Sequence, residues 1–141
     1  MRQIQLRENR EKQKLTEKLT KGKKTNLSFE VDYDYFETYF WPTVRHRHFS
    51  ARNITPHLVW TEIFSTIKGG ASAHLYPGLY MAEQAYIRET TNVFLSKEEK
   101  LDVFETFCQY ERWKINSGGY DLMDAVNYIL NYLRFRTYEG P

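Results

Sequence analysis

Four histidines supply the side chains best suited to binding a metal. His46 and His48 have the H-x-H spacing of metal ligands, His57 follows a few residues later, and His74 is the fourth histidine of the chain. Tetrahedral zinc needs a full set of ligands, each oriented by further hydrogen bonds. Because the segment 43–54 supplies no suitably spaced carboxylate, the sequence favours a solvated basic loop there over a metal site.

The same loop holds residues that could contact nucleic acid. We single out Arg45, Arg47, Arg52 and the preceding Trp41 as candidate contacts, because arginine binds phosphate oxygens and an aromatic ring can stack on a base. The alternative is that the aromatic residues of 33–41 are core residues that pack against a neighbouring helix. Their density favours this alternative.

Two candidates for catalysis have simpler structural explanations. Asp121 and Asp124 could act as an acid–base pair, but Asp121 is placed to cap a helix and Asp124 lies in its first turn, where the helix dipole favours negative charge. Cys108 falls in an apolar helical stripe with no histidine placed by sequence to activate it, and is predicted as a small buried hydrophobic residue. The sequence also lacks a Gly-rich phosphate loop of the form GxxxxGK[ST]. The residues alone predict no catalytic site.

Composition narrows the class of protein. The 141 residues allow one domain or a segment of a larger one, with 27% charged and 41% apolar residues. The sequence contains no apolar run near the roughly 18 residues that a membrane helix needs, and no signal peptide. A single cysteine rules out an internal disulfide and fits a reducing compartment. We therefore expect an intracellular protein, nuclear or cytoplasmic, with no membrane partner.

The charge is unevenly distributed. Residues 1–24 hold nine Lys/Arg and three Glu, a balance of +6, whereas residues 25–141 hold eleven Lys/Arg and fifteen Asp/Glu, a balance of −4. The basic head could contact nucleic acid or an acidic partner, although such a run is more often a solvated helix or linker. We divide the chain into a basic charged segment, 1–28, and a helical segment, 29–141.

The most distinctive predicted helix covers residues 55–70. Thr55 is placed to cap it, Pro56 takes its first position, and Gly69–Gly70 supplies the positive φ that ends it. Its apolar stripe consists of Val59, Trp60, Ile63, Phe64 and Ile67. We expect this helix to be covered on that side by the rest of the chain.

The remaining elements are also predicted to be helical, so the fold class is all-α, an irregular bundle of about four to five helices with a charged, partly exposed helix over 2–21. The predicted helices are Tyr33–Phe40, capped by Asp32 and stopped by Pro42; Leu79–Glu89; Ser96–Asn116, opened by an S-x-x-E capping box; and a last helix that begins after Asp121. In the last helix, the apolar stripe expected to pack against neighbours is Leu122, Val126, Ile129, Leu130 and Leu133.

Four strings of the sequence, taken in order, resemble one protein family. They are EVDYDYFETYFWP (30–42), TPHLVWTEIFSTIKGG (55–70), the helix 79–89 followed by the helix 96–116, and GGYDLMDAVNYIL (118–130). Together they resemble UvrD/Rep-like superfamily 1 helicases of the large eukaryotic type that includes TPR-and-ankyrin-repeat proteins. The resemblance covers about residues 29–141, and its most specific part is the LVWTEI…IKGG string.

The resemblance implies that this chain is most of the helical insertion, subdomain 1B, of the first RecA-like domain, together with the helix before the Walker B strand. The Walker A loop and the Walker B box, expected soon after Pro141, would lie outside it. No catalytic, cofactor-binding or metal-binding residue can then be assigned, and the parent protein would be the enzyme that binds ATP and magnesium. The partners implied are nucleic acid, held weakly, and the remainder of the RecA-like core. The alternative is a stand-alone helical module that binds a protein or nucleic acid without ATPase activity.

Overall fold

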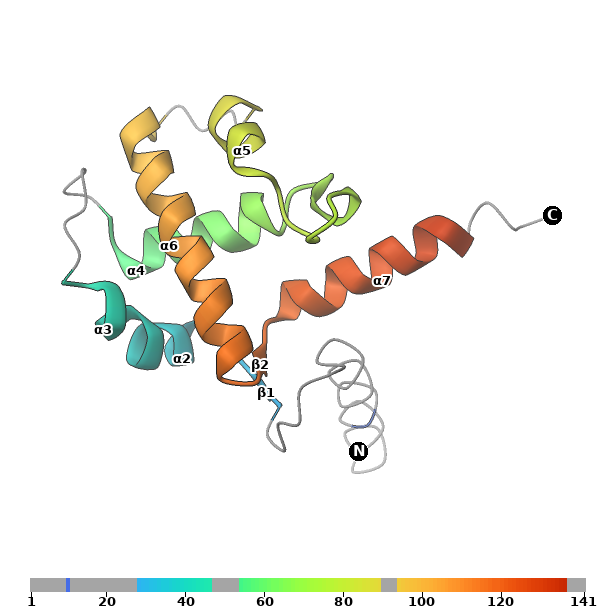
Figure 1. Cartoon of the computed structure of the whole chain (residues 1–141), viewed down its shortest axis with the longest axis horizontal. Coiled ribbons are helices and arrows are strands. Elements are labelled where there is room, and N and C mark those ends of the chain that lie inside the picture. Colours follow the sequence, from blue (N-terminus) through green and yellow to red (C-terminus); the bar gives the residue numbers. More distant parts are fainter. Residues whose placement is uncertain (1–9, 11–27, 47–53, 90–93, 137–141) are drawn as a thin grey trace.

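The structure, a computed structural model, describes residues 10, 28–46, 54–89 and 94–136, and these are mostly helical (Figure 1). The elements in chain order are β1 (Phe29–Glu30), α2 (Tyr33–Tyr35), the π-helix η1 (Phe36–Phe40), α3 (Trp41–Val44), α4 (Pro56–Glu62), the π-helix η2 (Ile63–Ile67), the 3-10 helix η3 (Ala73–Leu75), α5 (Glu83–Glu89), α6 (Lys97–Asn116), β2 (Gly119–Tyr120) and α7 (Leu122–Arg136). The predicted all-α class is confirmed. The helix predicted over 2–21 lies, apart from Arg10, outside the described residues.

The core is assembled around α6, which crosses α4 and meets the aromatic residues of the first helices (Figure 1). The buried Tyr110 ring lies 5.4 Å from the Phe36 ring, 5.5 Å from Phe40 and 6.3 Å from Trp60. Rings at these distances and tilts pack favourably beyond the area that they bury. Most aromatic residues of 33–41 therefore belong to the core, although Tyr39 is exposed.

The helix formed by α4 and η2 begins as predicted. The Thr55 hydroxyl accepts a hydrogen bond from the Leu58 N–H at 3.1 Å, and Pro56 occupies the first turn. The predicted apolar stripe faces the core, with Val59, Ile63 and Ile67 buried and Trp60 and Phe64 packed against them. This helix supplies one wall of the core.

The end of the same helix differs from the prediction, because neither residue of the Gly69–Gly70 pair adopts a positive φ. The helix ends through the wide turn η2, in which the Lys68 N–H donates to the Ile63 carbonyl oxygen, five residues back, at 2.8 Å. Glycine is needed for a different reason. A Cβ at position 69 would lie 1.7 Å from the Phe64 carbonyl oxygen.

The prediction that Pro42 stops the first helix is wrong, because the helical path continues to Val44. In an α-helix a proline removes one hydrogen bond and its ring clashes with the carbonyl group four residues back. Here the preceding turn is the π-helix η1, in which the Trp41 N–H donates to the Phe36 carbonyl oxygen. The wider π turn accommodates the proline ring within a continuous helix.

Two further predicted N-caps are confirmed. The Asp32 carboxylate accepts from the Tyr35 N–H at 2.8 Å at the start of α2. At the start of α6, the Glu99 N–H donates to the Ser96 hydroxyl and the Ser96 N–H donates to the Glu99 carboxylate, each at 3.2 Å. The capping box thus fixes the first turn of the longest helix.

The helix predicted from Leu79 begins only at Glu83, as α5. Leu79 has a φ of 63°, in the left-handed region that a right-handed helix excludes. Two contacts hold the backbone here: the Asn127 amide donates to the Leu79 carbonyl oxygen at 3.1 Å, and the Met81 N–H donates to the Ile67 carbonyl oxygen at 2.8 Å. Contacts with distant elements therefore override the local helical preference.

The strands β1 and β2 form a short parallel pair within the segment 29–141 that the sequence predicted to be helical. Phe29 pairs with Gly119 and Glu30 pairs with Tyr120. Gly119 permits the close approach, because a Cβ at that position would lie 3.1 Å from the Phe29 ring. The pair ties the start of the helical segment to the turn between α6 and α7.

Helix α7 turns its polar side to the body and its apolar side outward, so its predicted stripe does not pack against the described body. Asn127 is the buried residue of α7, whereas Leu122, Ile129 and Leu133 are 54%, 42% and 51% exposed. At 3.6 residues per turn, Asn127 and Ile129 lie roughly on opposite sides of the helix. The physical reason is a set of buried polar contacts at the start of α7, called the polar anchor below.

The close approach at Gly69 gives a stability prediction. We expect Gly69→Ala to lower the free energy of unfolding by about 2–4 kcal/mol, because the new Cβ must displace backbone. Gly78→Ala is the control, since its closest neighbour is the movable ring of Tyr80, at 2.9 Å. Urea unfolding followed by circular dichroism measures both. Equal stability of the two variants would contradict the role given to the η2 turn.

Candidate functional site

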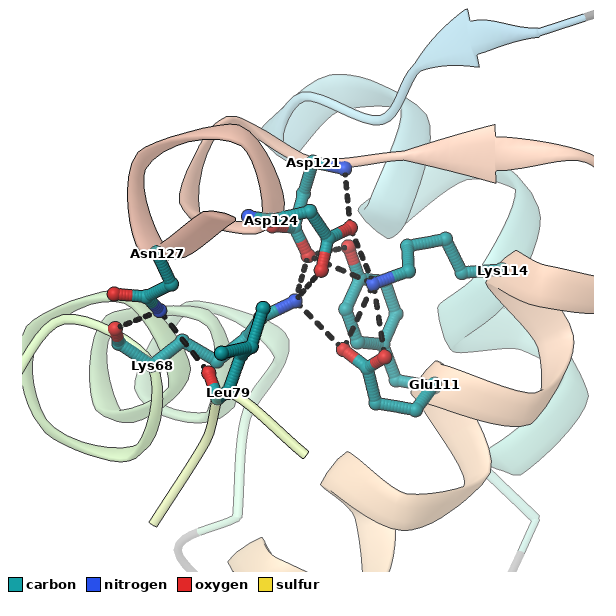
Figure 2. A network of polar contacts seen from close by, with 8 residues as sticks. Lys68, Leu79, Glu111, Lys114, Asp121, Asp124 and Asn127 are labelled. Atoms are coloured by element: carbon teal, nitrogen blue, oxygen red, sulfur yellow. Dashed lines mark hydrogen bonds and ion pairs between the residues drawn. The ribbon is translucent and has the colours of Figure 1, made fainter. Parts of the chain in front are cut away.

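The most unusual feature of the molecule is a cluster of five charged side chains inside the body, where α6, α7 and the end of η2 meet (Figure 2). Its members, called the ion cluster below, are Lys68, Glu111, Lys114, Asp121 and Asp124. The side chain of Asp121 is 0% exposed, and those of Lys68 and Lys114 are 2% and 3% exposed. Buried charges are costly unless they are paired and hydrogen-bonded.

Lys68 lies at the centre of the ion cluster. Its Nζ atom lies 2.8 Å from Glu111 Oε1, 2.8 Å from Asp121 Oδ2 and 2.5 Å from Asp124 Oδ1. An ammonium group has three donors, and here each points to a different carboxylate. All three protons of Lys68 are thus used, and three elements of the fold are joined at one atom.

Lys114 pairs with the same three carboxylates from the side of α6. Its Nζ atom lies 2.8 and 2.9 Å from the two oxygens of Glu111, 3.3 Å from Asp121 Oδ2 and 2.6 Å from Asp124 Oδ2. The Tyr110 hydroxyl donates to Asp121 Oδ2 at 3.0 Å. Two ammonium groups face three carboxylates, so the formal charge of the cluster is 2 − 3 = −1.

The two aspartates also open α7. The Asp124 N–H donates to Asp121 Oδ1 at 2.8 Å, and the Asp121 N–H donates to Asp124 Oδ2 at 2.9 Å. This reciprocal pair resembles a capping box made with aspartate in the place of glutamate. The predicted capping role is therefore correct, but each carboxylate also binds both lysines.

Asn127 extends the polar anchor by one turn of α7. Its amide nitrogen donates to the carbonyl oxygen of Lys68 at 2.6 Å and to that of Leu79 at 3.1 Å (Figure 2). The Lys68 carbonyl group would otherwise lie buried without this donor, at a cost of about 1–3 kcal/mol. The first turns of α7 are thus held by side-chain polar contacts in addition to packing.

The cluster holds Asp121 and Lys68 in their charged forms. Burial by itself would raise the pKa of the Asp121 carboxyl, but the ammonium groups of Lys68 and Lys114 outweigh burial and hold this pKa well below its usual range. Burial likewise opposes the charge of Lys68, yet the three carboxylates raise its pKa well above the usual value. Burial, and then the charge of Asp121, raises the pKa of Tyr110. The tyrosine therefore remains a hydrogen-bond donor.

The geometry argues for a structural role and against a catalytic one. The three carboxylates could in principle ligate a metal, since their oxygen atoms lie within 4.8 Å of one another. The Lys68 ammonium, however, binds one oxygen of each and takes the place of such a cation. An acid–base pair would need a proton that is readily exchanged, whereas the pKa of Asp121 is lowered.

The outward-facing side of α7 is an exposed apolar surface, and its orientation follows from the ion cluster. The outer face of α7, defined by Leu122, Ile129, Tyr132 and Leu133, consists of large apolar side chains that are between 42% and 54% exposed. Contiguous apolar patches larger than a few hundred Å² often mark interaction surfaces in soluble proteins. The ion cluster directs the polar side of α7 inward, and this leaves the apolar side outward.

Of the four residues predicted to contact nucleic acid, the structure describes two. Arg45 is exposed, and its Nε donates to the His46 ring at 3.3 Å. Trp41 is half-buried, with its ring 6.4 Å from Phe36 in the core, so only part of it can reach a ligand. Arg47 and Arg52 lie outside the described residues, and the proposed contact set stays a prediction.

The described histidines that were considered as metal ligands lie in different surroundings. His46 is exposed beside Arg45, whereas the His57 ring lies edge-on to Tyr33 with 5.8 Å between the ring centres. The buried Nδ1 of His74 has no hydrogen-bond partner. His48 is outside the described residues, and among those described, the convergent set of ligand atoms is the carboxylate set of the ion cluster.

Sequence reasoning missed Lys68 and Lys114. One signal was available. Lys68 directly follows an apolar stripe and precedes two glycines, so the buried helix that carries the stripe places Lys68 next to the core. Cys108 is half-buried, and burial raises the pKa of its thiol, consistent with the predicted unreactive role.

Comparison with known proteins gives no family assignment. No protein-family model matches the chain, and no solved structure matches it significantly. Within the described residues, no helix has the length and apolar character needed to cross a membrane.

Removing the central lysine tests the ion cluster. We expect Lys68→Met to lower the free energy of unfolding by about 3–5 kcal/mol, because it leaves the buried Asp121 and two partly buried carboxylates with one ammonium. Lys97→Met, at an exposed position in the first turn of α6, is the matched control and should change stability by less than about 0.5 kcal/mol. Chemical denaturation measures both variants. A destabilisation as small as that of the control would show that the cluster does not hold the fold.

The shifted pKa values predict the pH dependence of stability. Because the pKa of Asp121 is lowered, its contribution is present above about pH 4, the value for an unfolded aspartate, and is lost as the pH falls further. Because the pKa of Lys68 is raised, its contribution is present below about pH 10 and is lost above its folded value. We expect Asp121→Asn to have a flatter acid limb of stability than the wild type. Parallel acid limbs would contradict this assignment.

Proposed function

We propose that this chain is a non-catalytic helical part of a UvrD/Rep-like, ATP-dependent helicase, and that it works by packing and by guiding nucleic acid. The observation that carries the proposal is the outer face of α7, which presents apolar side chains where a self-contained domain would bury them. In such a parent, this face would lie against the remainder of the RecA-like core. The parent would bind ATP and magnesium outside this chain, in the nucleus or cytoplasm.

The positions of the strings that carry the resemblance support the proposal. Lys68 belongs to the string 55–70, and Asp121, Asp124 and Asn127 belong to the string 118–130. These side chains meet in and beside the ion cluster. Residues from two of the strings that suggest the family therefore fix the direction in which α7 leaves the body.

A stand-alone interaction module is the second candidate, and the closed core favours it. Phe36, Tyr86 and Tyr110 are each 0% exposed, and their rings pack on other residues of the same chain. Such a unit does not depend on a neighbouring sheet to bury its aromatic residues. In this case the outer face of α7 would bind a separate protein.

The full-length transcript tests the parentage. We expect a Walker A loop to be encoded before residue 1 and an acidic D-E-x-Q box to be encoded soon after Pro141. A mature transcript that encodes neither would overturn the helicase proposal and leave the module. Tight binding of ATP by the purified chain would contradict both candidates.

Fluorescence anisotropy with single-stranded DNA tests the guiding role. We expect weak binding, and Arg45→Ala/Arg47→Ala/Arg52→Ala should reduce the slope of log affinity against log salt by about 0.7 for each phosphate that the variant no longer neutralises. The control variant removes the same charge elsewhere, at the exposed Arg88, Lys97 and Arg112.

A chain lacking residues 1–24 completes the comparison. Binding that disappears with this deletion, while the triple variant and its control bind alike, would assign the contact to the basic head. The loop carrying Arg45 would then have no guiding role.

A further inference from the structure

We infer that α7 unfolds and refolds as one unit while the rest of the described body stays folded. In this order–disorder step, Leu122–Arg136 leaves the body and loses its helical hydrogen bonds, whereas Asp121 stays in the ion cluster. The fold thus contains a conformational device, a helix that is switched on and off by its polar contacts. The inference concerns α7 itself and does not depend on the helicase proposal.

The first observation is that the apolar core is complete without α7. Among the described residues, the buried core cluster and the apolar side chains packed against it all lie between Phe29 and Trp113 in the chain. Figure 1 shows α7 extending away from this body. It lies beside the single turn η3, whose Leu75 is still 50% exposed. Unfolding of α7 would therefore uncover little of the apolar surface that stabilises the body.

The second observation is that the ion cluster has balanced charge once Asp124 leaves it. The two ammonium groups then retain the carboxylates of Glu111 and Asp121, so the formal charge becomes 2 − 2 = 0. The side chain of Asp124 is also the most exposed of the three carboxylates, at 20% against 14% for Glu111 and 0% for Asp121. The loss of one partner for each lysine makes unfolded α7 a minor state, whereas the balanced charge keeps that state accessible.

The third observation is the point up to which the chain is tied to the body. The strand β2 pairs with β1, and the Val31 N–H donates to the Tyr120 carbonyl oxygen at 2.7 Å. Asp121 is held by groups of the body, because its Oδ2 accepts from the Lys68 ammonium at 2.8 Å and from the Tyr110 hydroxyl at 3.0 Å. The boundary between the folded body and an unfolded α7 therefore falls directly after Asp121.

The length of α7 makes its detachment and its unfolding one event. The helix has 15 residues, and isolated helices of about 12–15 residues are only marginally stable in water. Beyond Asp121, its polar contacts with the described body are those of Asp124 with the two lysines and those of Asn127 with the carbonyl groups of Lys68 and Leu79. When these contacts open, the helix loses its support, and its residues unfold together.

Native-state hydrogen exchange of the full chain tests the inference. The amides of residues 126–136, which have partners within the helix, report on α7, and the slowest amides of α6 report on unfolding of the body. We expect the α7 amides to exchange at least about tenfold faster than the slowest α6 amides, with one shared protection factor. Their exchange should depend little on urea, because opening uncovers little surface. Protection that falls steadily from residue 126 to Arg136 would indicate fraying of the helix end and overturn the inference.

A core variant separates local unfolding of α7 from unfolding of the whole chain. Ile63→Val shortens a side chain that is 0% exposed in the core and is a mild change that leaves the chain folded. We expect it to speed exchange of the slowest α6 amides about fivefold and to leave the α7 amides unchanged, because the body stays folded when α7 opens. Equal acceleration in the two helices would mean that α7 unfolds only together with the body, and the inference would fail.

An anchor variant tests which contacts hold α7 closed. Asn127→Ala removes the donor to the Lys68 and Leu79 carbonyl groups and should speed exchange of the α7 amides about fivefold or more. Asn131→Ala, one turn further along α7, is the matched control and should leave exchange unchanged or slow it. Alanine favours helix more than asparagine does, so faster exchange in the first variant can come only from the lost contacts. If the two variants exchanged alike, the polar anchor would not be what holds α7, and the inference would be overturned.

Discussion

The contact between the Lys68 ammonium and three carboxylates is the constraint on which the rest of the structure depends. It joins the end of η2 to α6 through Glu111 and to α7 through Asp121 and Asp124. Charges buried this deeply are tolerated only when each is paired with good geometry, and the second lysine, Lys114, completes the pairing. The arrangement allows little freedom, because moving one element would leave a buried charge without its partner.

The direction of α7 follows from this constraint. An amphipathic helix usually turns its apolar side to the core. Here Asp124 and Asn127 are on the side that faces the body, and they are held by Lys68, Lys114 and a backbone carbonyl group of Leu79. The apolar side must then face outward. An intramolecular electrostatic anchor thus leaves an apolar surface exposed, and this links the interior of the protein to its proposed function.

Two departures from α-helical geometry make the packing possible. The π turn before Pro42 admits a proline into a continuous helix, and this keeps Phe36 and Phe40 together on the Tyr110 ring. The π turn before Lys68 ends the central helix, with Gly69 fitting against the carbonyl oxygen of Phe64. Both turns show how local geometry serves the placement of aromatic and charged side chains.

The sequence by itself determined the helical class, the N-caps at Asp32, Thr55 and Ser96, and the buried stripe of the central helix. These features depend on residues close together in the chain, where spacing and capping chemistry can be recognised directly. It also identified Asp121 and Asp124 as caps, but not their pairing with Lys68, which lies 53 and 56 residues away. Only the tertiary structure decided that pairing, the left-handed Leu79 and the outward side of α7. The physical reason is that helical periodicity defines an apolar side, whereas long-range contacts between buried charges decide which way that side faces.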